Sequence, residues 1–182
     1  LNFVVFVVFQ YYYVGAGPYL RSIGFAEKHL MPAMTLGQMT EVLAMSSLAM
    51  VMRRVPMKVV LSIGIVAEIC RFGLLAFGTG AISSLGAISC HGFSIAFFMT
   101  ASLIYVDDYC SPTARSGVHQ LIAIIAFGLA AFVGSQLAGV AMDLFADNGA
   151  INYRAFWAVP FAIALIAWTI LLVALRYRPA HA

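Results

Sequence analysis

The sequence predicts an all-α membrane protein with six transmembrane helices. Hydrophobic residues make up 63% of the 182-residue chain and charged residues only 9%, whereas about a quarter of the residues in a soluble domain are charged. Apolar runs recur along the whole chain and approach the ~20 residues that a helix needs to cross a bilayer. Because lipid offers the backbone no hydrogen-bond partners, and the runs are too long for the strands of a barrel, we expect helical spans.

Charged residues and clusters of glycine and proline divide the chain into six apolar segments. The breaks between them fall at 24–29, 53–58, 78–80, 107–115 and 143–154. The predicted helices are 1–20, 32–52, 59–77, 82–105, 118–142 and 155–175. Short connections predict that neighbouring helices are antiparallel. The first segment starts inside an apolar run, from which we expect an N-terminal part to be missing.

Lysine and arginine predict the orientation, because cytoplasmic loops are enriched in them. The richer side has Arg53, Arg54, Lys58, Arg115, Arg176 and Arg178, and the opposite side has Arg21, Lys28 and Arg154. We therefore expect a multi-pass protein of the cell (inner) membrane, with the 53–58 loop and the C-terminus in the cytoplasm. The net charge of +3 is small and gives no reason to expect nucleic-acid binding.

Three polar side chains lie deep in the predicted spans. At ~1.5 Å per residue, Gln10 and Glu41 fall near the bilayer midplane. Gln38 and Glu41 are three residues apart and share one helix face. Ionisable groups at this depth are costly, so they usually face a bundle interior or an aqueous cavity. Two interpretations remain open, a site for a polar substrate or a proton, and hydrogen bonds that only tie helices together.

The other ionisable, histidine and cysteine residues are better explained by structural roles. Glu68 and Arg71 are three apart in the third segment, which favours an ion pair on one helix face. His91 and His119 are lone histidines and are interpreted as packing or interface residues. Cys70, Cys90 and Cys110 lie in or beside different spans, without the spacing of a zinc site or a disulfide framework. With no catalytic or phosphate-binding motif in view, we expect no enzyme, metal or cofactor.

Short motifs follow one another along nearly the whole chain. They are "FQYYYVGAGPYL", "LGQMTEVL", "RRVPMKVVL", "CRFGLLAFG", "HGFSIAFF", "YVDDYCSPTARSGVHQLI" and "FVGSQLAG". In this order and spacing they resemble the C-terminal six-helix half of the nucleoside:proton symporters of the major facilitator superfamily. The resemblance implies one half of a twelve-helix transporter, whose two halves enclose a nucleoside site and are each built from inverted three-helix repeats.

The resemblance also assigns the residues of the site. It implies that Gln10, Gln38 and Glu41 bind the substrate and that Glu41 exchanges a proton. Tyr13 or Phe97 would stack on the base. The implied partners are a nucleoside or a related small polar molecule, a proton, the lipid bilayer and the missing N-terminal half. The implied function is secondary active transport of nucleosides.

Two positions depart from the family pattern. A family asparagine is replaced by Tyr13, and a family acidic residue that precedes two aromatic residues is replaced by Ala96. Losing this carboxylate leaves two alternatives open. One is a major facilitator transporter for a sugar or another polar metabolite, and the other is a non-transporting membrane receptor or relic of the fold.

The Glu68–Arg71 pair matches the family pattern at one position only, and the basic loop resembles a feature of the whole superfamily. Arg71 matches a family arginine, whereas Glu68 stands where an apolar residue is usual. The local charge compensation supports a structural ion pair. The loop with Arg53, Arg54 and Lys58 resembles the superfamily's cytoplasmic gating loop, where basic residues bridge acidic helix ends.

Overall fold

The protein is nearly all helical in its computed structural model, which describes residues 1–147 and 149–174. The elements in chain order are α1 (Asn2–Ser22), α2 (Glu27–Met52), α3 (Met57–Phe77), α4 (Gly80–Ser94), η1 (Ile95–Thr100), α5 (Ala101–Tyr109), α6 (Arg115–Ala123), η2 (Ile124–Ala130), α7 (Ala131–Leu144), β1 (Ala146–Asp147), β2 (Ala150–Ile151) and α8 (Tyr153–Ala174). The π-helical segments η1 and η2 join their neighbours into two continuous 30-residue helices, Gly80–Tyr109 and Arg115–Leu144.

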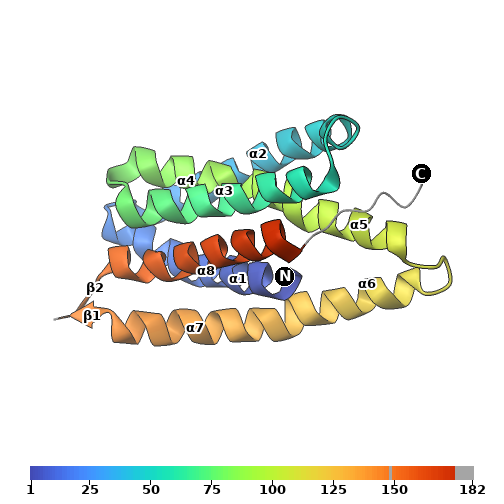
Figure 1. Ribbon diagram of the computed structural model, residues 1–182. Coiled ribbons are helices and arrows are strands. Elements are labelled where there is room, and N and C mark those ends of the chain that lie inside the picture. Colours follow the sequence, from blue (N-terminus) through green and yellow to red (C-terminus); the bar gives the residue numbers. More distant parts are fainter. Residues whose placement is uncertain (148, 175–182) are drawn as a thin grey trace.

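The long helices lie side by side and alternate in direction (Figure 1). α3 packs against α4 and α8, α2 packs against α4, and α1 packs against α7. The antiparallel β1–β2 hairpin lies at one end of the bundle, together with the α3–α4 connection. The α2–α3 loop, the α5–α6 turn and the start of α1 lie at the other end. The connections that the sequence predicts on one side therefore share one end of the bundle.

Each predicted segment overlaps one long helix, but the ends differ. α2 begins at Glu27, five residues before the predicted start, so Pro32 lies inside the helix. The fourth helix continues to Tyr109 and the fifth begins at Arg115. Apolar composition marks the part of a helix that lies in lipid, whereas backbone hydrogen bonding continues into the polar residues beyond it. Residue 175 of the last predicted span, and Arg176 and Arg178, lie outside the described residues.

Within the described residues, five helices are long and apolar enough to cross a membrane, namely Asn2–Ser22, Met57–Phe77, Gly80–Tyr109, Arg115–Leu144 and Tyr153–Ala174. α2 has 26 residues but does not reach the same hydropathy, because it contains Gln38, Glu41 and several hydroxyl residues. Its threonine and serine hydroxyls donate hydrogen bonds to carbonyls of their own helix, at Met31, Gly37, Leu43 and Ala44. These bonds satisfy the hydroxyls without help from water.

Glycines allow α2 and α4 to approach closely. A Cβ atom added at Gly92 would lie 2.1 Å from the backbone nitrogen of Glu41, and one added at Gly37 would lie 3.1 Å from the carbonyl oxygen of Ile88. Only glycine fits at a contact as short as the first, and small residues are how membrane helices bring their backbones together. This contact fixes the segment with Gln38 and Glu41 against the middle of α4.

Candidate functional site

A chain of polar side chains crosses from α3 to α4 inside the bundle. The side chains of Glu68 and Arg71 are 1% and 0% exposed. Arg71 Nη2 donates a hydrogen bond to Glu68 Oε2, and the Ser94 hydroxyl donates to Glu68 Oε1. Arg71 Nη1 lies 2.8 Å from His91 Nδ1. Because each charge has a partner, the pair avoids the cost of an isolated buried ion.

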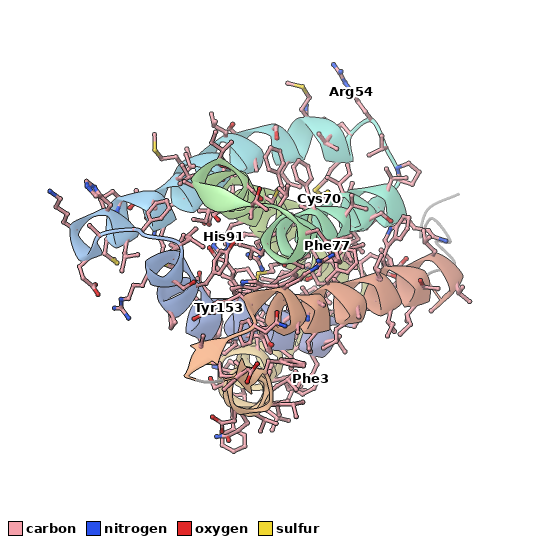
Figure 2. All side chains as sticks on the ribbon, turned by 90° about the vertical axis from the view of Figure 1, so that its left-hand side faces the viewer. Phe3, Arg54, Cys70, Phe77, His91 and Tyr153 are labelled. Carbon is pink, nitrogen blue, oxygen red and sulfur yellow. The ribbon has the colours of Figure 1, made fainter. Side chains whose placement is uncertain are left out.

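Aromatic rings enclose the arginine. The guanidinium carbon of Arg71 lies 4.3 Å from the ring centroid of Tyr12, 4.9 Å from that of Phe72 and 5.2 Å from that of Phe9. Rings at these distances attract a cation through their quadrupoles. Figure 2 shows His91 among the packed helices and Arg54 at the periphery. The charged centre is therefore closed off from solvent by α1 and α3.

The polar chain ends at a small cavity. His91 Nε2 lies 3.3 Å from the Tyr13 hydroxyl. The cavity has a volume of about 170 Å³ and is lined by Tyr12, Tyr13, Met31, Met34, Gln38, Ile88 and His91. Tyr13 is 46% exposed, and Gln38 is also exposed. The cavity thus joins α1, α2 and α4 close to the middle of each helix and offers polar groups there.

The structure brings three of the predicted site residues together. Tyr13 and Gln38 line the same cavity. Glu41 lies one turn after Gln38, is half-buried, and is near enough to Tyr13 to interact with it electrostatically. Within the described part of the chain, the Glu41 carboxylate makes no hydrogen bond or ion pair. It is therefore available to a ligand or a proton.

The other two predicted residues lie elsewhere. Gln10 Nε2 donates a hydrogen bond to the Ser135 hydroxyl on α7, at 3.2 Å. Gln10 is half-buried and does not line the cavity of Tyr13 and Gln38. Phe97 is only 4% exposed and packs in the hydrophobic cluster that contains Leu61 and Phe98. The structure therefore does not bring Phe97 to the cavity, and Tyr13 is the predicted aromatic residue that borders it.

His91 is the residue that sequence reasoning missed. The sequence favours a packing role for it, whereas in the structure it links the buried ion pair to the cavity. The spacing of polar residues on the two helices is a possible signal for the role of His91. Glu68 and Arg71 are three residues apart, and so are His91 and Ser94 on the next helix, in the reverse order that antiparallel packing requires. The spacing alone could not show that the two faces meet.

In the basic loop, the contact of Lys58 differs from the bridge to an acidic helix end that the resemblance implies. Arg53 and Arg54 are exposed between α2 and α3. Lys58 Nζ donates a hydrogen bond to the carbonyl of Leu172, so it fastens α3 to α8 instead of bridging to an acidic helix end. A second charged cluster lies at the α5–α6 turn. There Asp107 Oδ1 lies 3.2 Å from Arg115 Nε and 2.8 Å from His119 Nε2.

Three cavities are larger. Two of them, of about 360 and 440 Å³, are lined mostly by apolar side chains of α1, η1, α5, α6 and η2 and offer little to recognise a polar molecule. The third, of about 400 Å³, lies at the α3–α4 connection beside Tyr153 and Arg154, and neither Gln38 nor Glu41 lines it. The three cysteines form no disulfides, and in residues 1–147 and 149–174 no group of three or more histidine, cysteine or acidic residues is placed to hold a metal ion. The cavity at Tyr13 and Gln38 is the better candidate site for a polar ligand.

Antiparallel helices of membrane length, with a polar cavity and an unpaired carboxylate near their middle, define a multi-pass helical membrane protein with a candidate site for a polar ligand. The chain belongs to the nucleoside H+ symporter family, whose sequence profile matches residues 1–181. Membership in this family and the multi-pass helical architecture place the protein in the inner membrane.

Individual relatives support the same assignment. The chain is 32% identical over 162 residues to the "Putative nucleoside transporter YegT" of Escherichia coli (strain K12), which covers 85% of the chain and 37% of that protein. It is 27% identical over 158 residues to the xanthosine permease of the same organism, covering 85% of the chain and 38% of the permease. These relatives are named as a transporter and a permease, not as enzymes.

The fold matches a solved transporter structure. The crystal structure of the nucleoside transporter NupG superposes with a TM-score of 0.79 at 19% identity, covering 97% of this chain and 48% of that one. A single-residue variant of NupG gives a TM-score of 0.81. The chain therefore has the fold of one half of such a transporter. It spans about half the length of the solved structure and less than half the length of the curated relatives.

Proposed function

We propose that the chain supplies one six-helix half of a proton-coupled nucleoside transporter. The observation that carries the proposal is the cavity where Tyr13 and Gln38 meet beside Glu41, in a chain of the nucleoside H+ symporter family. The cavity is small and open on one side, because Tyr13 and Gln38 remain exposed. A second six-helix half, facing α1, α2 and α4, would complete a chamber large enough for a nucleoside.

In this proposal the polar residues have separate roles. The Gln38 amide has both a donor and an acceptor, so it can bind a base edge or a ribose hydroxyl. Gln10 uses its amide nitrogen for Ser135 and keeps its carbonyl oxygen for a ligand. Glu41 accepts the proton, or a hydrogen bond that a substrate hydroxyl donates. Substrate entry then changes the solvation of Glu41 and couples the two fluxes.

We also propose that the end of the bundle with the α2–α3 loop faces the cytoplasm. Arg53, Arg54, Lys58 and Arg115 gather there, and among the described residues at this end the acidic ones are Asp107 and Asp108. The C-terminal end of α8 lies at the same end of the bundle (Figure 1). The C-terminus, predicted to be cytoplasmic, falls on residues 175–182, which lie outside the described residues. With this orientation of α8, we propose that the C-terminus is cytoplasmic.

Uptake measurements test the function. Cells that lack their own nucleoside transporters would express the chain in its complete natural reading frame, and uptake of labelled uridine, adenosine and xanthosine would be followed with and without a proton uncoupler. We expect uptake that the uncoupler abolishes. Uptake that is insensitive to the uncoupler would contradict proton coupling, and absence of uptake by correctly inserted protein would contradict nucleoside transport.

A pair of variants tests the role of Glu41. We expect Glu41→Gln to lower uncoupler-sensitive uptake at least tenfold, because the amide cannot bind and release a proton. Asp143→Asn is the matched control, since Asp143 is an exposed carboxylate near the end of α7, and it should leave uptake unchanged. Native uptake and pH dependence in Glu41→Gln would remove Glu41 from the mechanism.

A further inference from the structure

The contact between Arg71 and His91 fixes the protonation of the histidine ring. A guanidinium group has only donors and no acceptor. At 2.8 Å, His91 Nδ1 must therefore accept the hydrogen bond from Arg71 Nη1 and cannot have a hydrogen of its own. The ring is then neutral, and its hydrogen is on Nε2.

The same argument sets the direction of the next hydrogen bond. Because Nε2 has the hydrogen, it donates to the Tyr13 hydroxyl oxygen 3.3 Å away. The hydroxyl hydrogen of Tyr13 must then point elsewhere. Among the described residues, His91 is the one hydrogen-bond partner of this hydroxyl, and the side chain borders the cavity. Tyr13 thus presents an unused donor to whatever occupies the cavity.

The direction of this series of hydrogen bonds is fixed at its buried end, by Glu68 and Ser94. The Glu68 carboxylate fixes the Arg71 guanidinium, and the Ser94 hydroxyl fixes the carboxylate. The Phe9 ring stacks on His91 with centroids 4.8 Å apart. Reversing the histidine tautomer would aim an N–H at the guanidinium and leave Arg71 Nη1 without its acceptor, which is costly in this buried environment. The direction from Glu68 to Tyr13 is therefore built into the packing.

We propose that Tyr13 donates a hydrogen bond to a carbonyl oxygen of the bound base, and that His91 is the positioning residue that fixes Tyr13 as a donor. The inference rests on the proposed nucleoside transport. A carbonyl oxygen has two lone pairs and accepts over a broad range of angles, which suits a hydroxyl already held on one side by His91. The expected ligands are nucleosides whose base has a carbonyl group, because the cavity presents the Tyr13 hydroxyl to them as a donor.

Sulfur-substituted nucleosides test the donor. A thiocarbonyl keeps the shape of the base but is a poorer hydrogen-bond acceptor. Affinities of the purified full-length protein would be measured for uridine, 2-thiouridine and 4-thiouridine. We expect one of the two substitutions to weaken binding by about three- to tenfold, the value of one hydrogen bond. In Tyr13→Phe, uridine should bind more weakly and the same sulfur substitution should no longer matter.

Two further variants separate positioning from a general structural role. His91→Gln keeps an N–H at the position of Nε2 and an oxygen for Arg71, and should retain the discrimination between oxygen and sulfur. His91→Leu should lose it. Tyr11→Phe is the matched control, because the Tyr11 hydroxyl donates to the carbonyl of Phe156, away from the cavity, and the discrimination should persist.

The outcomes distinguish this inference from the proposed function. If the native protein binds uridine but neither sulfur substitution matters, or if Tyr13→Phe keeps the native discrimination, Tyr13 is not a donor to a carbonyl and the inference is overturned while nucleoside binding stands. If the native protein binds none of the nucleosides, the proposed function fails and the inference fails with it. Equal discrimination in His91→Leu and the native protein would overturn the role of His91 alone.

Discussion

Two clusters in this protein have the same three residue types, an acidic residue, an arginine and a histidine, but lie in different surroundings. Glu68, Arg71 and His91 are buried between α3 and α4. Asp107, Arg115 and His119 lie at the α5–α6 turn, where the side chains of Asp107 and Arg115 are 31% and 49% exposed. In both clusters one residue bridges the other two, the arginine in the buried cluster and the aspartate in the exposed one.

The comparison shows that surroundings, more than the residue types, decide what a charged cluster does. Water and salt screen the exposed cluster, so its interactions contribute little to stability. The buried cluster has no such screening, and each member must have its partner. Its hydrogen bonds therefore keep fixed directions, and the proposed orientation of Tyr13 depends on this property. The following predictions test that contrast, beginning with the largest expected effect.

Removing the buried arginine should destabilise the protein most. Arg71→Met keeps much of the side-chain volume but leaves the Glu68 carboxylate without its cation and His91 Nδ1 without its donor. We expect a loss of about 3–5 kcal/mol in the free energy of unfolding, the usual effect of breaking a buried ion pair. Thermal unfolding of the purified protein in detergent or in lipid bilayers measures it.

The double variant Glu68→Gln and Arg71→Met is the control for this prediction. Removing both charges removes the unpaired carboxylate, so much of the lost stability should return. If the single Arg71 variant unfolded like the native protein, the cluster would not be shielded from water and the contrast with the exposed cluster would disappear.

Widening the close contact between α2 and α4 should have an intermediate effect. Gly92 follows His91, and a Cβ there would meet the backbone of Glu41 at 2.1 Å. Gly92→Ala must therefore push α2 away from α4, and we expect a loss of about 1–3 kcal/mol from overpacking. Nucleoside affinity should fall with it, because Gln38 and Glu41 move. Both unfolding and binding assays report the change.

Gly139→Ala on α7 is the matched substitution, because a Cβ at Gly139 meets no atom within 4 Å. Alanine favours helix over glycine by up to about 1 kcal/mol, so this variant should be as stable as the native protein or slightly more so. Equal losses in the two glycine variants would show that the α2–α4 contact is not the cause.

Removing the exposed carboxylate should have the smallest effect. Asp107→Asn weakens the contacts with Arg115 and His119, but the pair with Arg115 is partly exposed, so we expect a loss of no more than about 1 kcal/mol. The difference from the native protein should shrink further when unfolding is repeated at high salt. A loss as large as that of Arg71→Met would mean that the cluster is buried against another part of the transporter.

The sequence was sufficient for the membrane class and for the course of the helices, but less so for their ends. The apolar runs predict helices because lipid leaves the backbone no alternative. They could not show that α2 begins at Glu27, because helical hydrogen bonds extend beyond the apolar part of the segment. The family followed from the order of the motifs, and the family profile matches residues 1–181.

The site was only partly accessible from the sequence. Gln38 and Glu41 stand out because polar residues are rare in such a segment and share one helix face. Their neighbours do not stand out. Phe97 is aromatic and close to the departure at Ala96, yet the packing around η1 turns it into the core. His91 has no partner within its own helix, and the contacts that give it a role come from Arg71 on α3 and Tyr13 on α1.

The sequence by itself determined that the chain has apolar helices of membrane length, that it belongs to a nucleoside symporter family, and that a glutamine and a glutamate share one face of the second helix. These properties depend on composition and on spacing along one helix, which are local. Only the tertiary structure decided which helix faces meet. The direction of the hydrogen bonds from Glu68 through Arg71 and His91 to Tyr13 follows from distances between three helices, and no pattern along one helix contains those distances.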